Sequence, residues 1–436
     1  MSSLKFKRVA VLMLAGAAFA MMGSDGDGDR REGSSHEAER EWREGSSHEA
    51  EREWREGSSH ESEREWRERS SHERERGWRK GLSHEAEREL RDAGVDKYLG
   101  EFTPAQSIEI EGGWVKHTYD IDAGEGPICI AGTPYSVFTR RGRSSKKLLI
   151  FEQGGGACWQ DFYNCNILSE DQEPPGPEQG IFDRSNRDNP FRRYSIVYMP
   201  YCDGSVFTGD NDVVDPNFPF GPVRYHRGLR NQSAAMDLAK ATFPKARRIT
   251  VAGSSAGGVG AAGFAPFLTR MNFGNRVKLT VFNDAGPVTV NPDALGAIEA
   301  RAADWDFGQF YPASCTECSD VGDATEVIKW RLDNDSRIRE AIYQTDSDFT
   351  NRFFLGLLGN QPRFRELVVD GHGVINDEFP DRYKRFIVAG DVSHTALQVP
   401  LFYTQDADGV LLSDWTYSFL KNKDAWIDIV EPPLLP

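Results

Sequence analysis

Short apolar runs recur along the chain from about residue 147, and most of them end at a glycine or a polar residue. Runs that are apolar throughout are typical of strands buried on both faces, as in a parallel sheet. We predict such strands at 147–151, 195–199, 248–252, 279–283 and 385–390. We also predict a helix at 232–242 and antiparallel strands within 113–130. Strands that alternate with helices indicate an α/β fold with a mostly parallel sheet and a site along one sheet edge.

The run at 248–252 continues into Gly-Ser-Ser-Ala-Gly at 253–257, and a segment of small residues follows. A strand, a sharp turn and a helix form the context in which a Gly-x-Ser-x-Gly motif presents a nucleophile. The two glycines let other backbone pass close to the strained turn. The register exposes the hydroxyl of Ser255 and leaves Ser254 beside it. We therefore predict Ser255 as a nucleophile.

A serine nucleophile needs a base to accept its proton. Outside the N-terminal repeat described below, the histidines are His117, His226, His372 and His394. His394 follows the last predicted strand by a short loop, the position from which a base can reach a serine above neighbouring strands. We predict His226 in a loop that could line the cleft, and His372 at a solvent-exposed turn tip. The predicted base is His394.

A carboxylate must orient the imidazole of that base. The chain order Ser, Asp, His of α/β-hydrolases favours the segment 341–348, which contains Asp346 and Asp348. We prefer Asp348 and keep Asp346 as the alternative. Asp391 lies three residues before His394 and is expected to cap its loop.

Acyl transfer also needs hydrogen-bond donors for the developing oxyanion. Three glycines and an alanine at 154–157 directly follow the strand at 147–151. Without side chains, several N–H groups can converge on one point there. The amide of Ala256, directly after the serine, supplies a further donor.

The first twenty residues have the features of a secretory signal peptide. A basic stretch precedes an apolar run at 9–19, and Ala-Phe-Ala at 18–20 fits a cleavage site. The apolar run is too short to span a bilayer, so we expect a protein that is exported, secreted or periplasmic, and not membrane-spanning. Export would allow the six cysteines of the 436-residue chain to form disulfides.

A twelve-residue repeat follows, with histidines at 36, 48, 60, 72 and 84. Twelve residues turn a helix by about 120° beyond whole turns, so successive tryptophans of the repeat point in different directions. Because no apolar stripe forms, we expect residues 21–94 to be a disordered or solvated helical arm. The expected catalytic domain is 95–436.

A formal net charge of −16 disfavours nucleic acid as a partner. The repeat histidines lack the i, i+4 spacing of a helical zinc site. We expect neither a metal nor an organic cofactor.

Four motifs carry a resemblance to a known family. They are Gln-Gly-Gly-Gly-Ala-Cys-Trp at 153–159, Tyr-Cys-Asp-Gly-Ser-Val-Phe-Thr-Gly-Asp at 201–210, Gly-Ser-Ser-Ala-Gly-Gly at 253–258 and Asn-Asp-Ala-Gly-Pro at 283–287. Their order resembles that in the pectin acetylesterase/Notum family, including its bacterial-type members. The resemblance implies a secreted serine hydrolase with an α/β-hydrolase-like three-layer sandwich. Plant members remove acetyl groups from pectin, and the animal protein Notum removes a fatty acyl group from a signalling protein.

The resemblance also implies roles for individual residues. It assigns the nucleophile to Ser255, the base to His394 and the acid to Asp348, with Asn351 where the family usually has Gln. The implied oxyanion donors are Gly155, Gly156 and Ala256.

The resemblance further implies a short disulfide between Cys158 and Cys165. Cys315 and Cys318 lack the strand–helix context of a redox motif, so we expect a second short disulfide. Cys129 and Cys202 are then left to pair.

These observations predict an exported serine esterase acting on acyl esters. An acetyl ester of a cell-wall polysaccharide such as pectin is the first expectation, and a longer-chain acyl ester is the alternative. A third hypothesis is a surface-binding protein on a hydrolase scaffold, with the repeat as its working part. The sequence does not indicate an oligomeric state.

Overall fold

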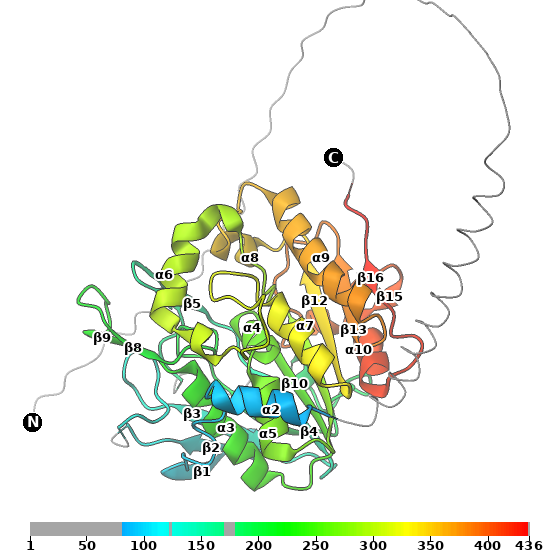
Figure 1. Ribbon diagram of the computed structural model, residues 1–436. Coiled ribbons are helices and arrows are strands. Elements are labelled where there is room, and N and C mark those ends of the chain that lie inside the picture. Colours follow the sequence, from blue (N-terminus) through cyan, green and yellow to red (C-terminus); the bar gives the residue numbers. More distant parts are fainter. Residues whose placement is uncertain (1–80, 122–123, 170–178, 435–436) are drawn as a thin grey trace, which may run out of the picture. The chain divides into compact units, whose positions relative to one another are not determined.

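A ten-stranded mixed sheet organises the part of the chain that the computed structural model describes, residues 81–121, 124–169 and 179–434 (Figure 1). All described residues belong to one compact unit. The expected signal peptide (1–20) and most of the repeat lie outside the described residues. The sheet order is β1 (Gln106–Ile110), β2 (Trp114–Thr118), β3 (Ser136–Arg140), β7 (Ser195–Met199), β4 (Lys147–Glu152), β10 (Arg248–Ser254), β11 (Lys278–Asp284), β12 (Ile338–Thr345), β13 (Tyr383–Val388) and β16 (Ile429–Val430).

Neighbouring strands from β7 to β16 run parallel, whereas β1, β2 and β3 form an antiparallel edge that joins β7. The five predicted parallel strands are all present, with ends shifted by at most two residues. The antiparallel region starts earlier and ends later than the predicted 113–130, at β1 and β3. The mostly parallel sheet is confirmed.

The strand β12 was not predicted because charged residues interrupt its apolar pattern. Glu340 is buried in this strand, and the guanidinium of Arg331 donates to both of its carboxylate oxygens over 2.7 Å. A buried carboxylate is tolerated when a partner satisfies it. The partner lies on a helix, so the local pattern of the strand gives no sign of it.

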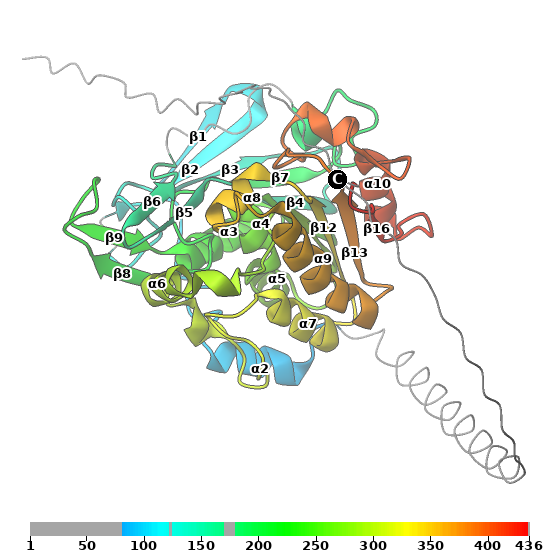
Figure 2. The same cartoon turned by 90° about the horizontal axis from the view of Figure 1, so that it is seen from above.

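Helices cover both faces of the sheet (Figures 1 and 2). They are α2 (His84–Asp92), α3 (Gly228–Thr242), α4 (Ala256–Ala262), α5 (Ala265–Phe273), α6 (Leu295–Trp305), α7 (Thr325–Asn334), α8 (Phe349–Phe354), α9 (Gln361–Glu378) and α10 (Leu412–Lys421). Short hairpins are formed by β5 (Gly156–Trp159) with β6 (Phe162–Cys165), β8 (Asn211–Val214) with β9 (Val223–His226), and β14 (Asp406–Ala407) with β15 (Val410–Leu411). In this part of the chain, no helix is long and apolar enough to cross a membrane.

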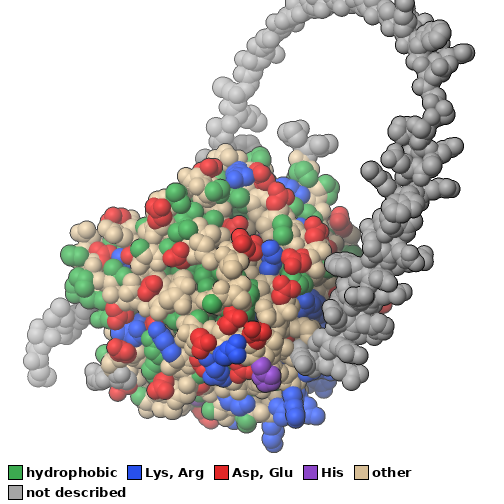
Figure 3. All heavy atoms as spheres, viewed as in Figure 1, with side chains coloured by type: hydrophobic (Ala, Val, Ile, Leu, Met, Phe, Trp, Pro, Cys, Tyr) green, Lys and Arg blue, Asp and Glu red, His purple; other side chains and the backbone are tan. Residues whose placement is uncertain are grey.

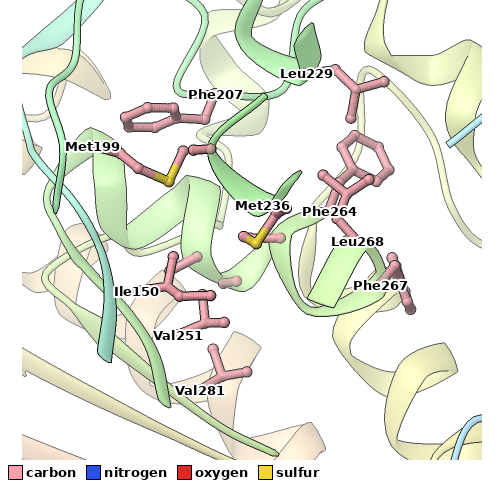
Figure 4. Packing of buried hydrophobic residues seen from close by; sticks show 14 of the residues in the cluster. Ile150, Met199, Phe207, Leu229, Met236, Val251, Phe264, Phe267, Leu268 and Val281 are labelled. Atoms are coloured by element: carbon pink, nitrogen blue, oxygen red, sulfur yellow. The ribbon is translucent and has the colours of Figure 1, made fainter. Parts of the chain in front are cut away.

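Alternate residues of each central strand enter different cores. Ile150, Val251 and Val281 pack against α3 and α5, together with Met236 and Phe267 (Figure 4). The intervening positions of the same strands contribute to the opposite core, where α10 packs. This alternation follows from the two-residue period of a strand. The result is the predicted three-layer, α/β-hydrolase-like sandwich.

The helix α2 lies before residue 95, the expected start of the catalytic domain, but it packs against the core of that domain. Ala86 and Leu90 lie four residues apart on one face of α2 and are buried in the main core, and Leu82, just before the N-cap, is buried there as well. Ser83 caps the helix by accepting from the amide of Ala86 over 3.1 Å. The packed unit therefore includes residues 81–94, which we assigned to the arm.

This last unit of the repeat differs from the earlier units at two of the positions that it buries. Leu82 stands where each of the four earlier units has a serine, and Leu90 stands where each of them has a tryptophan. The two leucines restore the apolar stripe that the repeat otherwise lacks. The docking of this segment was therefore readable from the sequence, as a departure from the repeat.

Candidate active site

The sharp turn between β10 and α4 holds Ser255 in a strained conformation. Its backbone has φ 57° and ψ −121°, a region that non-glycine residues rarely adopt. A Cβ on Gly253 would lie 2.0 Å from the carbonyl oxygen of Gly257, and one on Gly257 would lie 2.0 Å from that of Glu152. Only glycine fits at these two positions. The turn thus has the strand–turn–helix geometry of a nucleophile elbow.

His394 contacts Asp348 across the ends of two neighbouring strands. Nδ1 of His394, in the loop after β13, lies 2.7 Å from Oδ2 of Asp348, just after β12. Asp348 is fully buried, whereas Nε2 of His394 is buried without a hydrogen-bond partner among the described residues. An imidazole oriented through Nδ1 keeps Nε2 available for proton transfer.

Neutral donors hold the carboxylate of Asp348 in place. The amide of Asn351 donates to Oδ1 over 2.9 Å, and the side chains of Gln344 and Asn351 donate to Oδ2 over 2.9 and 3.0 Å. Asn351, the position at which this chain departs from the family pattern, thus serves the acid directly.

The alternative acid, Asp346, has other partners. Its carboxylate accepts from Arg365 over 2.6 Å and from the amide of Gly390 over 2.7 Å. Asp391 accepts from the amide of Ser393 over 2.7 Å, the expected capping contact in that loop. The structure therefore places Asp348, and neither of the other two carboxylates, against His394.

Asp284 connects the elbow to the histidine loop, a role that the sequence did not reveal. Its carboxylate accepts from the hydroxyl of Ser254 over 2.5 Å and from the amides of Ala396 and Leu397 over 3.0 and 2.9 Å. Its carbonyl oxygen accepts from the amide of Ser255 over 2.7 Å. Burial raises the pKa of Asp284 to about 6, against these stabilising hydrogen bonds. One buried carboxyl group thus links the segments that contain Ser255 and His394.

The glycine loop after β4 lies directly against the elbow. A Cβ on Gly154 would lie 2.6 Å from the carbonyl oxygen of Ser254 and 2.8 Å from the Cβ of Ser255. Gly156 has φ 80° and a Cβ there would clash with the backbone of Asn164. Close approach of backbone to the serine is what an oxyanion site requires.

Three disulfides are present, as expected: Cys158–Cys165, Cys315–Cys318 and Cys129–Cys202. The first joins β5 to β6 behind the glycine loop. The third connects the segment before β3 to the segment after β7. Both therefore restrain segments that adjoin the candidate active site.

A cavity of about 140 Å³ opens at Ser255. Gly156 and Ala256, two of the expected oxyanion donors, line it as well. Six aromatic residues contribute to its wall: Trp159, Phe264, Trp305, Phe307, Tyr311 and Phe354. Arg301 also lines the cavity and is the only charged residue among its lining residues in the described part of the chain. No motif in the sequence marked this arginine as a site residue.

The other histidines serve the fold. His372 is fully buried within α9, and its nitrogens lie 2.6 Å from the hydroxyl of Tyr383 and 2.6 Å from the carbonyl oxygen of Pro287. The predicted exposed turn is wrong because Gly371 and Gly373 permit close packing within a helix: a Cβ on Gly371 would lie 2.8 Å from the methyl group of Thr289.

His226 was predicted in a loop lining the cleft, but it ends β9 and is fully buried. It lies 2.8 Å from Nη1 of Arg224 and 3.1 Å from the carbonyl oxygen of Asp203. Burial and the charge of Arg224 lower its pKa to about 3. His117 lies in β2 between Ser107 and Thr139, at 2.8 and 2.9 Å.

Across the residues that the structure describes, no group of three or more histidine, cysteine, aspartate or glutamate side chains is arranged to hold a metal ion. On the face shown in Figure 3, acidic side chains lie among basic ones.

Part of the chain that carries these features is similar to known proteins. The family model for pectinacetylesterase matches residues 112–304, which include the glycine loop and the elbow. Palmitoleoyl-protein carboxylesterase notum1a of Danio rerio is 28% identical over 142 residues, 30% of this chain and 27% of that protein. Pectin acetylesterase 11 of Arabidopsis thaliana is 25% identical over 211 residues, 44% of this chain and 52% of that protein.

The fold and the serine elbow place this protein in the class of α/β-hydrolase-like proteins. The chain is similar to the pectin acetylesterase/Notum family over the matched residues 112–304. It spans between about a quarter and a half of the length of these two relatives. A further relative, 26% identical over 113 residues, 24% of this chain and 76% of that protein, is named inactive palmitoleoyl-protein carboxylesterase notum1b of Danio rerio.

Proposed function

We propose that this protein is a serine carboxylic-ester hydrolase with the triad Ser255, His394 and Asp348. The observation that carries the proposal is the 2.7 Å contact between His394 Nδ1 and Asp348 Oδ2, in a loop that Asp284 ties to the strained serine turn. A serine, an imidazole and a buried carboxylate in this chain order constitute the machinery of acyl transfer.

In the proposed reaction, the Oγ of Ser255 attacks the ester carbonyl carbon while Nε2 of His394 accepts the hydroxyl proton. The amides of Gly155, Gly156 and Ala256 stabilise the oxyanion of the tetrahedral intermediate. His394 then donates its proton to the leaving alcohol, and an acyl-enzyme remains. A water molecule, deprotonated by the same imidazole, then attacks the carbonyl carbon of the acyl-enzyme. The bond between this carbon and Oγ of Ser255 breaks, and His394 returns the proton to Oγ.

The cavity favours an acyl group longer than acetyl. An engineered apolar cavity of about 150 Å³ accommodates benzene, and the cavity at Ser255 is of similar size, about 140 Å³. Its aromatic wall suits an alkyl chain, whereas an acetyl group would leave most of the space unfilled. We therefore propose a medium-chain acyl ester as the preferred substrate, with an acetyl ester of a polysaccharide as the second candidate.

We further propose that the protein is exported through its first twenty residues. The three disulfides support this, because disulfides form and persist in oxidising compartments. The rival hypothesis of a surface-binding protein on a hydrolase scaffold is weakened by the joined His394–Asp348 pair. A surface-binding protein without catalytic activity would have no need for this His394–Asp348 pair.

A fluorophosphonate probe and an ester series test the proposal. We expect the probe to modify Ser255 covalently, and the Ser255→Ala variant to remain unmodified. In a series of 4-nitrophenyl esters from acetate to palmitate, kcat/KM should be highest at intermediate chain lengths. An unmodified Ser255 together with no turnover of any ester would refute the proposed function. A maximum at acetate would instead support the second candidate.

A further inference from the structure

Arg301 differs from the buried arginines of this protein because it has no carboxylate partner among the described residues. Arg224, Arg230, Arg270 and Arg331 are buried, and each forms an ion pair with a carboxylate within 2.8 Å. The guanidinium of Arg301 forms no hydrogen bond or ion pair with any described residue, and its Nε is buried without a partner. A charged donor removed from water is costly unless an acceptor meets it.

The surroundings of Arg301 leave its hydrogen-bonding edge unused. The guanidinium lies over the ring of Trp305, with its carbon 5.6 Å from the ring centroid. Asp323 is a nearby acid, but it forms no ion pair with Arg301 and instead accepts from the amide of Val290 over 2.6 Å. Burial lowers the pKa of Arg301, and Tyr311 and Asp323 partly oppose this effect.

Arg301 borders the cavity that also contains Ser255. The guanidinium is planar and presents its N–H groups in a fork that matches the two oxygens of a carboxylate. Among the described residues, no other charged side chain lines this cavity. A substrate that reaches from the serine into the cavity with an anionic end would complete the hydrogen bonds of Arg301.

We propose that the acyl group of the substrate carries a carboxylate that binds Arg301, so that the enzyme hydrolyses half-esters of medium-chain dicarboxylic acids. The inference rests on the proposed function, because it places the ester carbonyl at Ser255. Arg301 is then a specificity-determining residue. It recognises the acyl part and takes no part in the bond-breaking steps.

The test compares two esters that differ only at the end of the acyl chain. These are 4-nitrophenyl hexanoate and the mono-4-nitrophenyl ester of adipic acid, which both have six acyl carbons. We expect the wild-type protein to show the higher kcat/KM for the adipate half-ester. Arg301→Met should lower the ratio of the adipate value to the hexanoate value at least tenfold, and Arg301→Lys should give an intermediate ratio.

Arg88→Met is the matched control, because Arg88 is exposed on α2 and does not line the cavity. We expect it to change neither ester, and thermal melting of all variants checks that they fold. An equal loss of both esters in Arg301→Met would overturn the inference and indicate a structural role. A wild-type preference for the hexanoate ester would also overturn it.

A third substrate, the hexanoate ester of 4-hydroxybenzoic acid, places the carboxylate on the leaving group. If Arg301→Met reduces turnover of this ester alone, the acyl-side assignment is wrong. Binding provides a readout that is independent of catalysis: adipate should raise the melting temperature of wild-type protein and of Ser255→Ala, but not of Arg301→Met. Stabilisation by adipate without any ester turnover would support the Arg301 site while refuting the proposed function. No stabilisation of either protein would overturn the site.

Discussion

The hydroxyl of Ser254 donates to Oδ2 of Asp284 over 2.5 Å, one position before the proposed nucleophile. The same carboxylate accepts from the backbone that follows His394. Ser254 therefore belongs to the connection between the elbow and the histidine loop, whereas Ser255 is partly exposed in the turn. The two adjacent serines have separable roles.

We expect Ser255→Ala to lower kcat by a factor on the order of 10⁶, the usual effect of losing a nucleophile. Ser254→Ala should retain most of the activity but lower the free energy of unfolding by about 1–3 kcal/mol, because Asp284 loses a buried donor. Ester hydrolysis and denaturant unfolding of both variants are the measurements. An inactive, folded Ser254→Ala protein would show that the nucleophile has been assigned to the wrong serine.

The two neighbouring aspartates provide a similar comparison. Asp348→Asn should lower kcat by a factor on the order of 10⁴, because the amide cannot stabilise the imidazolium and favours the wrong tautomer. Asp346→Asn removes the partner of Arg365 and should mainly reduce stability, with kcat per folded molecule within about tenfold of wild type. Steady-state kinetics at matched folded concentrations distinguish these effects. The reverse ranking of the two variants would make Asp346 the acid.

The helix α2 should be part of the folding unit. Leu90 is fully buried, so Leu90→Ala should cost about 2–5 kcal/mol of unfolding free energy. Arg88→Ala, on the exposed face of the same helix, should change it by less than about 0.5 kcal/mol. A chain truncated to start at Val95 should melt well below one that starts at Gly81. Equal melting temperatures of the two truncated chains would show that α2 contributes nothing to folding.

His372 should make stability depend on pH. Burial lowers its pKa to about 4, while the unfolded side chain titrates near 6.5. Between pH 6.5 and about 4, His372 therefore binds a proton in the unfolded chain but stays neutral in the folded protein. The free energy of unfolding falls as the pH drops towards 4.

His372→Gln removes this proton but can still donate to Pro287 and accept from Tyr383. We expect the stability advantage of wild type over this variant to shrink by about 2–3 kcal/mol between pH 7 and pH 4.5. Denaturant titrations at both pH values measure the gap. His226 is present in both proteins, so its own titration cancels. A gap that does not change with pH would contradict the buried, neutral imidazole.

The local pattern of the sequence was sufficient for the central strands, because a strand buried on both faces must be apolar along its length. The elbow was also readable, since the strained turn at Ser255 requires glycine at both flanking positions. The order of Ser255, an aspartate and His394 at successive strand ends narrowed the site further. Parallel strands place their carboxyl ends along one edge, so residues distant in sequence meet there.

Only the tertiary structure decided which partner each polar group has. Asp346 and Asp348 are two residues apart, and the difference between them lies in Arg365 and His394, which come from other elements. The same holds for the buried Glu340 in β12 and for Asp284, whose donors lie far along the chain. A local pattern records whether a segment is apolar. Whether a buried charge is satisfied depends on contacts that exist only after the chain has folded.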